Sequence, residues 1–257
     1  ISRDLHVSRT AIWKHINILK ERGYIFESST RKGYRLIYAP NLLTPLEIDS
    51  ALHTETFGRH VVYLSSTTST NEEAKKIARE GAEEGTIVVA EEQTGGRGRL
   101  TRSFYCPFAK GIWFTLILRP KFFPMEASKC TLMAAVGVCR GIRRLGLQDA
   151  GIKWPNDILY HGKKLVGILT EMSASMEKID YIIIGAGINT GMKKSEFPEL
   201  FRESATSFLA EGIDVSRKDL LAAILAELEK EYEIAQTQGF DKVLEDWKAL
   251  SITLGQD

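Results

Sequence analysis

The sequence is poor in cysteine, which limits the covalent and metal chemistry open to it. Its 257 residues include three cysteines, Cys106, Cys130 and Cys139, and these form no Cys-x-x-Cys or Cys/His spacing. An odd number of cysteines cannot all pair within one chain. We therefore expect reduced thiols in the core or at the surface, with neither a disulfide framework nor a protein-held metal site.

Long apolar runs are also missing. No stretch approaches the roughly 18 apolar residues of a membrane-spanning helix, and residues 1–4, Ile-Ser-Arg-Asp, lack the apolar core of a signal peptide. We therefore expect a cytoplasmic protein with no membrane partner. Because the first residue is not methionine, we also expect that the N-terminal segment lacks its opening helix.

What the sequence does contain fits a globular chain of two domains. Apolar residues make up 44% and charged residues 26%, which is enough to bury a core and to keep a polar surface. The length exceeds the size of a single small domain. Charge divides the chain unevenly, because residues 1–38 carry eight basic and three acidic side chains, a net charge of +5, whereas the remainder is −4. Only the N-terminal segment therefore suits a polyanion.

The N-terminal segment has the pattern of a winged helix-turn-helix. Ser8 can cap a helix whose apolar residues recur every three or four positions, and Gly23 can end it. Two alternating strands follow, around a basic turn at residues 28–33. Candidate DNA contacts lie on the helix and in the turn: Ser8, Arg9, Thr10, Trp13, Lys14, Asn17, Arg31 and Lys32.

The same helix could also be an ordinary amphipathic helix with a solvated charged face, although the hairpin and the local charge favour DNA binding. Pro40 to Pro45 then resembles a linker that ends in a new helix cap. We therefore place a DNA-binding domain at residues 1–40 and a second domain at residues 41–257.

The second domain alternates strand-like runs with two helical stretches. Strands are predicted at 60–64, 86–92, 111–118, 151–159, 164–172 and 180–187, and helices at 71–80, introduced by Ser69 and Thr70, and at 125–145. Several strands follow one another directly. This order predicts an α+β fold with a mixed, largely antiparallel sheet rather than a doubly wound one. Further helices are predicted near 216–236 and 240–249.

An unusual loop at residues 95–102, Gly-Gly-Arg-Gly-Arg-Leu-Thr-Arg, holds three arginines and no acid. Glycines allow backbone amides to approach an anion, and guanidinium groups bind phosphate oxygens in pairs. The loop lacks the Gly-Lys-Ser/Thr of a Walker motif and does not open a helix. Taken alone, such a segment is more often a mobile, solvated basic loop.

Two further segments carry polar chemistry on apolar strands. Lys153 interrupts the run 151–159 and should reach water, an acid or an anionic ligand. A hairpin follows, and Lys163 and Lys164 near its turn could be plain turn lysines. The strand at 180–187 ends in Gly-Ala-Gly-Ile-Asn, which is either a tight bend or a place of close backbone approach.

Taken together and in order, five motifs resemble the biotin protein ligase family. They are Ser69-Thr70-Asn71, Gln93 with Gly96-Arg97-Gly98-Arg99, Lys153-Trp154-Pro155-Asn156-Asp157, the run from Lys164 to Leu169, and Gly185-Ala186-Gly187-Ile188-Asn189. The resemblance covers about residues 60–191. With the winged helix before it, the chain is similar to the class of ligases that also repress biotin genes.

The resemblance implies a catalytic core like that of class II aminoacyl-tRNA synthetases. It implies that biotin and ATP, accompanied by Mg²⁺, form biotinyl-5′-AMP, and that the biotinyl group then passes to a lysine of a biotin carboxyl carrier protein. It also implies operator DNA as a partner and a homodimer when biotinyl-AMP is bound. No protein-bound metal is implied.

The resemblance assigns roles residue by residue. It implies catalytic roles for Lys164, Arg99 and Lys153. It implies biotin contacts from Ser69, Thr70, Asn71, Gln93, Gly96, Arg97, Gly98, Arg99 and Lys164. It implies nucleotide contacts from Arg97, Arg99, Lys153, Asn156, Asp157 and Asn189.

The sequence departs from the family pattern in three places. Thr101 stands where the family often has glycine, and Phe104 stands where it often has tryptophan, so an aromatic wall is kept but the indole donor is lost. We expect the small SH3-like C-terminal domain to be absent. Two other functions stay open: a DNA-binding sensor that binds biotin without transferring it, and a ligase for lipoate.

Overall fold

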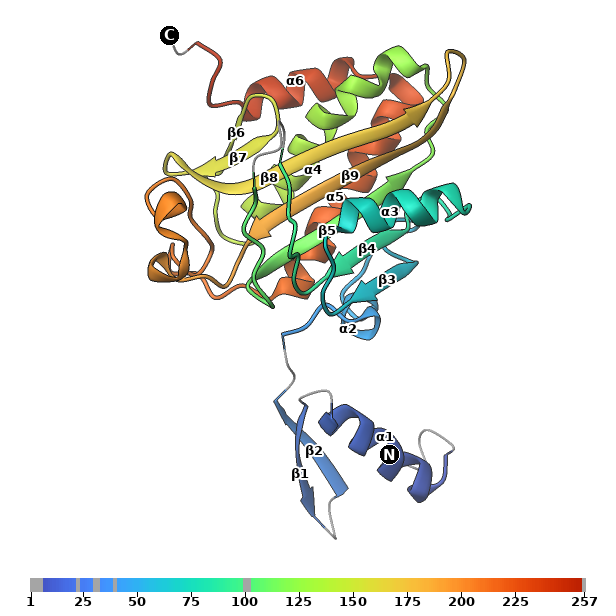
Figure 1. Ribbon diagram of the computed structural model, residues 1–257, viewed down its shortest axis with the longest axis vertical. Coiled ribbons are helices and arrows are strands. Elements are labelled where there is room, and N and C mark those ends of the chain that lie inside the picture. Colours follow the sequence, from blue (N-terminus) through green and yellow to red (C-terminus); the bar gives the residue numbers. More distant parts are fainter. Residues whose placement is uncertain (1–6, 22–23, 30–32, 39–40, 99–102, 256–257) are drawn as a thin grey trace. The chain divides into compact units, whose positions relative to one another are not determined.

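The computed structural model describes residues 7–21, 24–29, 33–38, 41–98 and 103–255. Within it the chain forms two compact units, Ile1–Asn41 and Leu42–Asp257. Figure 1 shows the elements of both units. Among the described residues, no helix is long and apolar enough to cross a membrane.

The N-terminal unit is a helix followed by a hairpin, in the predicted order. Helix α1 (Arg9–Glu21) begins where Ser8 Oγ accepts a hydrogen bond from the backbone N–H of Ala11, at 3.1 Å. Strands β1 (Ile25–Ser29) and β2 (Gly33–Tyr38) pair antiparallel, with Ser29 opposite Gly33. The predicted helix stop at Gly23 lies outside the described residues, as does the turn between the two strands.

The second unit is built on one seven-stranded sheet with the strand order β3-β4-β5-β9-β8-β7-β6. β3 and β4 pair in parallel, and every other neighbouring pair in this order is antiparallel. The prediction of a mixed, largely antiparallel sheet is therefore confirmed. The strands are β3 (Val61–Leu64), β4 (Ile87–Ala90), β5 (Gly111–Leu118), β6 (Gly151–Lys153), β7 (Asp157–Tyr160), β8 (Lys163–Ala174) and β9 (Ile179–Asn189).

Helices cover the two faces of the sheet unequally (Figure 1). Helices α4 (Cys130–Arg144), α5 (Arg217–Gln238) and α6 (Asp241–Leu250) form a layer over one face and bury the main core, whereas α3 (Thr70–Arg79) packs on the other face. Short elements complete the unit: α2 (Pro45–Asp49) and the 3₁₀ turns η2 (Pro124–Lys129), η3 (Lys194–Glu196) and η4 (Glu199–Phe201).

Alternation along the central strand β5 separates these two faces. Ile112 and Leu116 belong to the main core beneath α4 and α5, while Ile117 packs with α3. Successive side chains of a strand point to opposite faces, so Thr115, at an odd position, shares the α3 side with Ile117. Thr115 is therefore a polar side chain on the α3 side of a largely apolar strand.

Two predicted elements are wrong in detail. The run 151–159 is not one strand but two, β6 and β7, which pair with each other across a turn at residues 154–156. Pro155 has no backbone N–H to give to a sheet, so the strand ends before it. The helix expected at 125–145 divides into the 3₁₀ turn η2 and the α-helix α4.

The expected cap before α2 is present, because Thr44 Oγ1 accepts from the Glu47 N–H at 3.4 Å.

Candidate functional site

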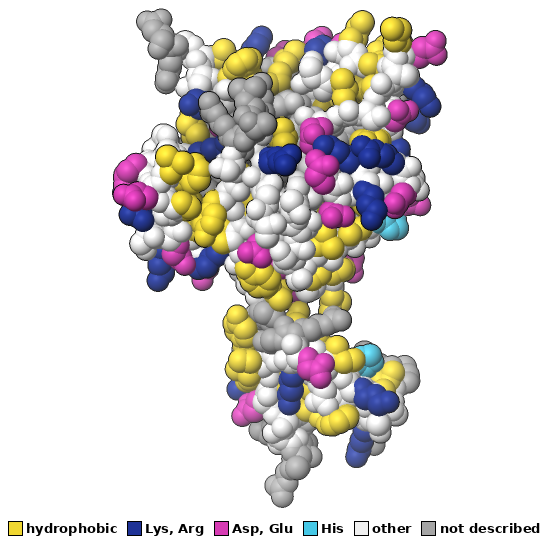
Figure 2. All heavy atoms as spheres, viewed as in Figure 1, with side chains coloured by type: hydrophobic (Ala, Val, Ile, Leu, Met, Phe, Trp, Pro, Cys, Tyr) yellow, Lys and Arg dark blue, Asp and Glu magenta, His cyan; other side chains and the backbone are white. Residues whose placement is uncertain are grey.

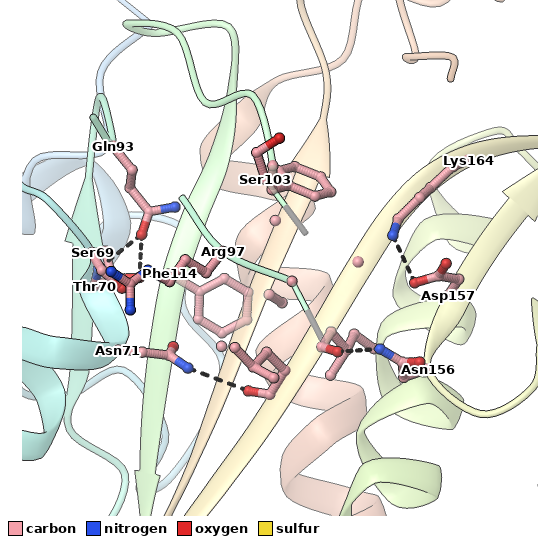
Figure 3. Close-up of a pocket in the computed structure, with 18 of the residues that line it drawn as sticks. Ser69, Thr70, Asn71, Gln93, Arg97, Ser103, Phe114, Asn156, Asp157 and Lys164 are labelled. Carbon is pink, nitrogen blue, oxygen red and sulfur yellow. Dashed lines mark hydrogen bonds and ion pairs between the residues drawn. The ribbon is translucent and has the colours of Figure 1, made fainter. Parts of the chain in front are cut away.

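A cavity of about 400 Å³ opens on the α3 side of the sheet. Its wall combines the start of α3, the arms of the glycine-arginine loop, the β6–β7 turn and the middle of β8 and β9 (Figure 3). Ligand pockets for small molecules commonly have a volume of this order. The predicted site residues that line it are Ser69, Thr70, Asn71, Gln93, Arg97, Gly98, Lys153, Asn156, Asp157 and Lys164.

One end of the cavity is polar but uncharged. The Oε1 atom of Gln93 accepts the backbone N–H of Thr70 at 2.8 Å and lies 3.0 Å from the Thr70 hydroxyl. Its Nε2 group donates to the sulfur of Cys106 at 3.2 Å, so both ends of the Gln93 amide are fixed. Ser69 stands at the N-cap of α3 without a side-chain cap bond, contrary to the expected capping role.

Cys106 lies beneath this polar end as a buried thiol. Burial raises its pKa to about 12, although the hydrogen bond from Gln93 acts in the opposite direction. The group therefore stays a neutral thiol at physiological pH. Cys130 and Cys139 are likewise free and buried.

The floor of the cavity is made of glycines on β8 and β9. A Cβ atom on Gly167 would lie 3.0 Å from the ring of Phe104, and one on Gly187 would lie 2.9 Å from the same ring. A Cβ on Gly185 would collide with the side-chain amide of Asn71. The Gly-Ala-Gly-Ile-Asn segment is therefore a place of close approach and not only a bend, because each glycine makes room for a side chain from another element.

The other end of the cavity carries the charges. Lys164 forms an ion pair with Asp157, at 2.8 Å between Nζ and Oδ1, and its ammonium group lies 5.6 Å from the centre of the Phe104 ring. Lys153 stands opposite Asp157 in the β6–β7 pairing. It ends β6 and is exposed rather than interrupting a buried strand. Arg97, also exposed, contributes a third cation to the wall.

The two ends of the glycine-arginine loop, the segment at residues 95–102, pair with each other. Arg97 and Ser103 form an isolated antiparallel bridge, and the Phe104 N–H donates to the Gly96 carbonyl at 2.9 Å. This pairing directs Phe104 across the cavity, where its ring meets Trp113 edge-on at 5.9 Å between ring centres. Arg99 and Thr101 lie outside the described residues.

A second cavity, of about 520 Å³, adjoins the first. The two share the five wall residues Ser103, Phe104, Lys153, Asp157 and Lys164. Asn189 lines the second cavity and not the first, and its amide nitrogen donates to the Thr206 carbonyl at 3.0 Å. The lysines thus stand at the boundary between two spaces.

Two predicted site residues have positions that the sequence did not suggest. Gly96 lines neither of these cavities but a third, shallower hollow beside the loop. Asn156 is buried, and its side-chain nitrogen donates to the Ile168 carbonyl at 2.5 Å, which ties the β6–β7 turn to β8 (Figure 3). Its side chain therefore positions the turn.

Two further residues, Thr115 and Glu171, contact the predicted site residues although no motif in the sequence contains them. Thr115 is fully buried on β5, with its hydroxyl 2.8 Å from that of Thr70 and 2.7 Å from Asn71 Oδ1. Glu171 on β8 accepts from Asn71 Nδ2 at 2.8 Å. A threonine within an apolar strand was a usable signal for Thr115, whereas Glu171 is joined to the site only by the fold.

A separate candidate surface lies on α1. Arg9, Thr10, Trp13 and Lys14 are exposed, and Asn17 is half-buried. Their spacing of three and four residues places these side chains along one side of the helix. Arg31 and Lys32, the predicted wing cations, lie outside the described residues.

Comparison with known proteins assigns the family. The model of the biotin/lipoate A/B protein ligase family matches residues 63–189, and that of an HTH domain matches residues 1–35. The bifunctional ligase/repressor BirA of Bacillus spizizenii is 43% identical over 99% of this chain and 79% of its own length. The chain belongs to the biotin/lipoate A/B protein ligase family. The BirA protein of Bacillus subtilis is similar to this ligase-family chain at 42% identity, with the same coverage.

A solved structure agrees with this membership of the ligase family. The biotin protein ligase from Aquifex aeolicus in complex with biotin and ATP matches with a TM-score of 0.67 and 28% sequence identity. The match covers 77% of this chain and 81% of the other. The predicted fold class, a helix-turn-helix unit followed by a ligase-type catalytic domain, is thus confirmed.

Proposed function

We propose that the protein is an ATP-dependent biotin ligase that transfers biotin to a lysine of a biotin carboxyl carrier protein through biotinyl-5′-AMP, and that its helix-turn-helix unit represses biotin genes. The observation that carries the ligase function is the position of Lys164, with Lys153, at the boundary of two adjoining cavities. One cavity suits the acid and the other the nucleotide. Their anionic groups would then meet at the lysines.

The first chemical step requires positive charge at the boundary between the two cavities. A carboxylate oxygen of biotin attacks the α-phosphorus of ATP, the bond from that phosphorus to the bridging oxygen breaks, and pyrophosphate leaves with the bonding electrons. The amine of the carrier lysine then attacks the acyl carbon, AMP leaves, and the amine loses a proton. The first step brings two anions together, so fixed positive charge is the main requirement.

The residues of the first cavity divide this work. Ser69, Thr70 and Gln93 would bind the ureido ring, since hydroxyl and amide groups match its donors and acceptor. Phe104 would cover the apolar part of biotin. Lys164 would exchange its partner Asp157 for the carboxylate and the α-phosphate.

Arg97 and Lys153 would add charge around the phosphates, and Arg99 would supply a further cation. Asn189, in the second cavity, would lie beside the nucleotide. Mg²⁺ would enter as the ATP complex, held largely by phosphate and water. Asp157 is the one carboxylate among the described residues that line the two cavities. A single carboxylate offers Mg²⁺ few protein ligands, which fits a metal ion that arrives bound to ATP.

Two variants test the ligase mechanism. Lys164→Ala and Arg99→Ala should each lose about 2–4 kcal/mol of transition-state stabilisation, as expected for removing one preorganised charge partner. The measurement is pyrophosphate release with saturating biotin and ATP. Adenylation close to the wild-type rate in both variants would reject these roles.

Two other experiments address the alternative functions. Transfer of labelled biotin to a carrier domain separates a ligase from a sensor that only binds biotin. The shift in melting temperature with biotin, compared with that with lipoate, shows which acid the protein binds.

The repressor function would use the exposed face of α1. One helix-turn-helix unit reads one half-site, so an operator with two half-sites requires two copies of the chain. We therefore propose a homodimer that forms when biotinyl-AMP is bound. Carrier, ATP and DNA are all met in the cytoplasm, where we place the protein.

A further inference from the structure

A chain of hydrogen bonds runs from the polar end of the first cavity, between α3 and the sheet, to Glu171 and the surface. It contains three oxygen–oxygen contacts in a row. They are Asn71 Oδ1 to Thr115 Oγ1 at 2.7 Å, Thr115 Oγ1 to Thr70 Oγ1 at 2.8 Å, and Thr70 Oγ1 to Gln93 Oε1 at 3.0 Å. We call these four side chains the relay. Thr115 is fully buried and Thr70 and Asn71 nearly so, so no route to bulk water relieves the chain at its centre.

Both ends of the relay are carbonyl oxygens whose orientation is fixed. Asn71 must turn its nitrogen toward Glu171 Oε2 at 2.8 Å and the Leu169 carbonyl at 3.5 Å, because both of these groups only accept. Figure 3 shows this amide facing β8. At the other end, the backbone N–H of Thr70 holds Gln93 Oε1 in place at 2.8 Å. Neither amide can therefore rotate to give the relay an N–H.

The relay consequently has too few hydrogens. Three oxygen–oxygen contacts at hydrogen-bond distance each require one hydrogen. The amide hydrogens of Asn71 and Gln93 point away from these contacts, so the hydrogens available to them are those of the Thr70 and Thr115 hydroxyls. One contact must lack its hydrogen in every arrangement. Such a contact places two oxygen lone pairs face to face in a buried setting, which is costly.

The outer end of the relay is held by charge. The ammonium of Lys75 lies 2.6 Å from Glu171 Oε1 and 2.9 Å from Glu72 Oε1. Burial alone would lower the pKa of Lys75, but the contacts with Glu171 and Glu72 outweigh it and raise that pKa. Lys75 therefore stays protonated and keeps Glu171 an acceptor. Figure 2 shows basic and acidic side chains intermixed over the region of α3.

We propose that the missing hydrogen is supplied by the ligand, and that Thr115 and Glu171 are positioning residues which make the cavity select an acid bearing an N–H donor. Of the three contacts, the one between Thr70 and Gln93 is the one whose two residues both line the cavity, so a ligand N–H can reach both of its oxygens there. When a ligand N–H enters, the Thr70 hydroxyl turns to Thr115 and the Thr115 hydroxyl turns to Asn71. The ligand hydrogen is then shared by the Thr70 and Gln93 oxygens, and each of the other two contacts has a hydroxyl hydrogen.

This inference rests on the proposed function and adds a basis for choosing among acids. The ureido ring of biotin carries N–H groups, whereas lipoate and octanoate carry no such donor. A carboxylic acid without an N–H would occupy the same apolar space and leave the relay one hydrogen short. The selection thus arises from the count of hydrogens and not from the shape of the cavity alone.

The experiment compares two variants that change the hydrogens available to the relay, here called the relay variants, with two controls. Thr115→Val removes a hydroxyl and two contacts, so the remaining hydrogen of Thr70 satisfies Gln93 and no deficit is left. Glu171→Gln can donate an N–H to the Asn71 carbonyl oxygen. The Asn71 amide can then rotate and donate its own N–H to the Thr115 hydroxyl. Thr115→Ser keeps the hydroxyl. Thr54→Val removes another buried hydroxyl, one bonded to the Phe57 carbonyl away from the cavity.

We expect Thr115→Val and Glu171→Gln each to raise the dissociation constant for biotin about tenfold, the size of one lost neutral hydrogen bond. The KM for ATP and the weak binding of octanoate should stay within twofold of wild type. Thr115→Ser should bind biotin like wild type. Thr54→Val should melt at a lower temperature and still bind biotin normally.

Three results would overturn the inference. They are Thr115→Val binding biotin as tightly as Thr115→Ser, Glu171→Gln leaving biotin binding unchanged, or parallel losses of biotin, octanoate and ATP binding in the relay variants. A wild-type protein that neither binds biotin nor releases pyrophosphate would instead reject the proposed function. The two failures are therefore distinguishable.

Discussion

At Gly187 the site depends on the absence of a side chain. Phe104 occupies the space that a Cβ atom would need, with its ring 2.9 Å from that point, and the same ring lies 3.0 Å from the corresponding point on Gly167. The aromatic wall and the strand floor are therefore in direct contact. This fit sets where the Phe104 ring stands relative to Lys164.

We expect Gly187→Ala to displace Phe104 and raise the KM for biotin about tenfold, comparable to the loss of one well-placed contact. Gly191→Ala is the matched control, since the nearest atom to its Cβ lies 3.8 Å away and the position lines neither cavity. Steady-state kinetics with varied biotin provide the measurement. Equal KM values in the two variants would show that the wall tolerates the added methyl group.

At the scale of single elements, the hairpin of β7 and β8 places Lys164. Its two turn residues, His161 and Gly162, both have positive φ, 48° and 75°, the geometry of a type I′ turn. Open space surrounds the Cβ position of Gly162, so backbone conformation and not crowding decides what a substitution does there.

Gly162→Ala should lower the free energy of unfolding by about 1–2 kcal/mol, the usual cost of left-handed backbone for an L-residue. Gly162→Asn should lose less, because asparagine tolerates that region better. Urea unfolding followed by circular dichroism measures both. A variant order with alanine at least as stable as asparagine would contradict the turn geometry.

The sequence predicted elements well where the signal was local. Apolar alternation and turn residues predicted β5 and the β7–β8 hairpin, and Thr44 predicted the start of α2. The error at 151–159 came from weighing apolar character above Pro155, which was itself the signal for a break. The 3₁₀ start of α4 was not visible, because residues 124–144 have one continuous helical pattern.

Most of the predicted site residues line one cavity, but the sequence did not predict their partners. Motif order brought Thr70, Gln93 and Lys164 together correctly, since all three line one cavity. Asp157 was assigned to the nucleotide, yet in this structure it pairs with Lys164. Thr115 lies 45 positions from Thr70 and Glu171 lies 100 from Asn71, so only the register of the sheet reveals these contacts.

At the scale of the whole molecule, the charge asymmetry of the sequence separates two tasks. The basic side chains of α1 belong to the N-terminal unit, and the remaining chain is net acidic. DNA affinity should therefore come from a small part of the protein. It should also depend steeply on salt, since each neutralised phosphate releases counterions.

We expect Arg9→Ala and Lys14→Ala each to weaken DNA binding and to reduce the slope of log affinity against log salt by about 1 if the side chain meets a phosphate. Lys218→Ala, in the second unit, is the control and should leave the slope unchanged. Gel shifts over a salt series provide the slopes. Unchanged slopes in both α1 variants would exclude this face of α1 as the phosphate-binding surface.

One buried carboxylate joins the first turn of the second unit to its sheet. Glu91, just after β4, accepts the backbone N–H of Leu43 at 2.7 Å and pairs with Arg217 at 2.7 Å, while Arg217 also donates to the Gly111 carbonyl. Leu43 stands two residues beyond Asn41, where the N-terminal unit ends. The same carboxylate therefore fixes the start of the second unit to the sheet two residues before Gln93, a wall residue of the first cavity.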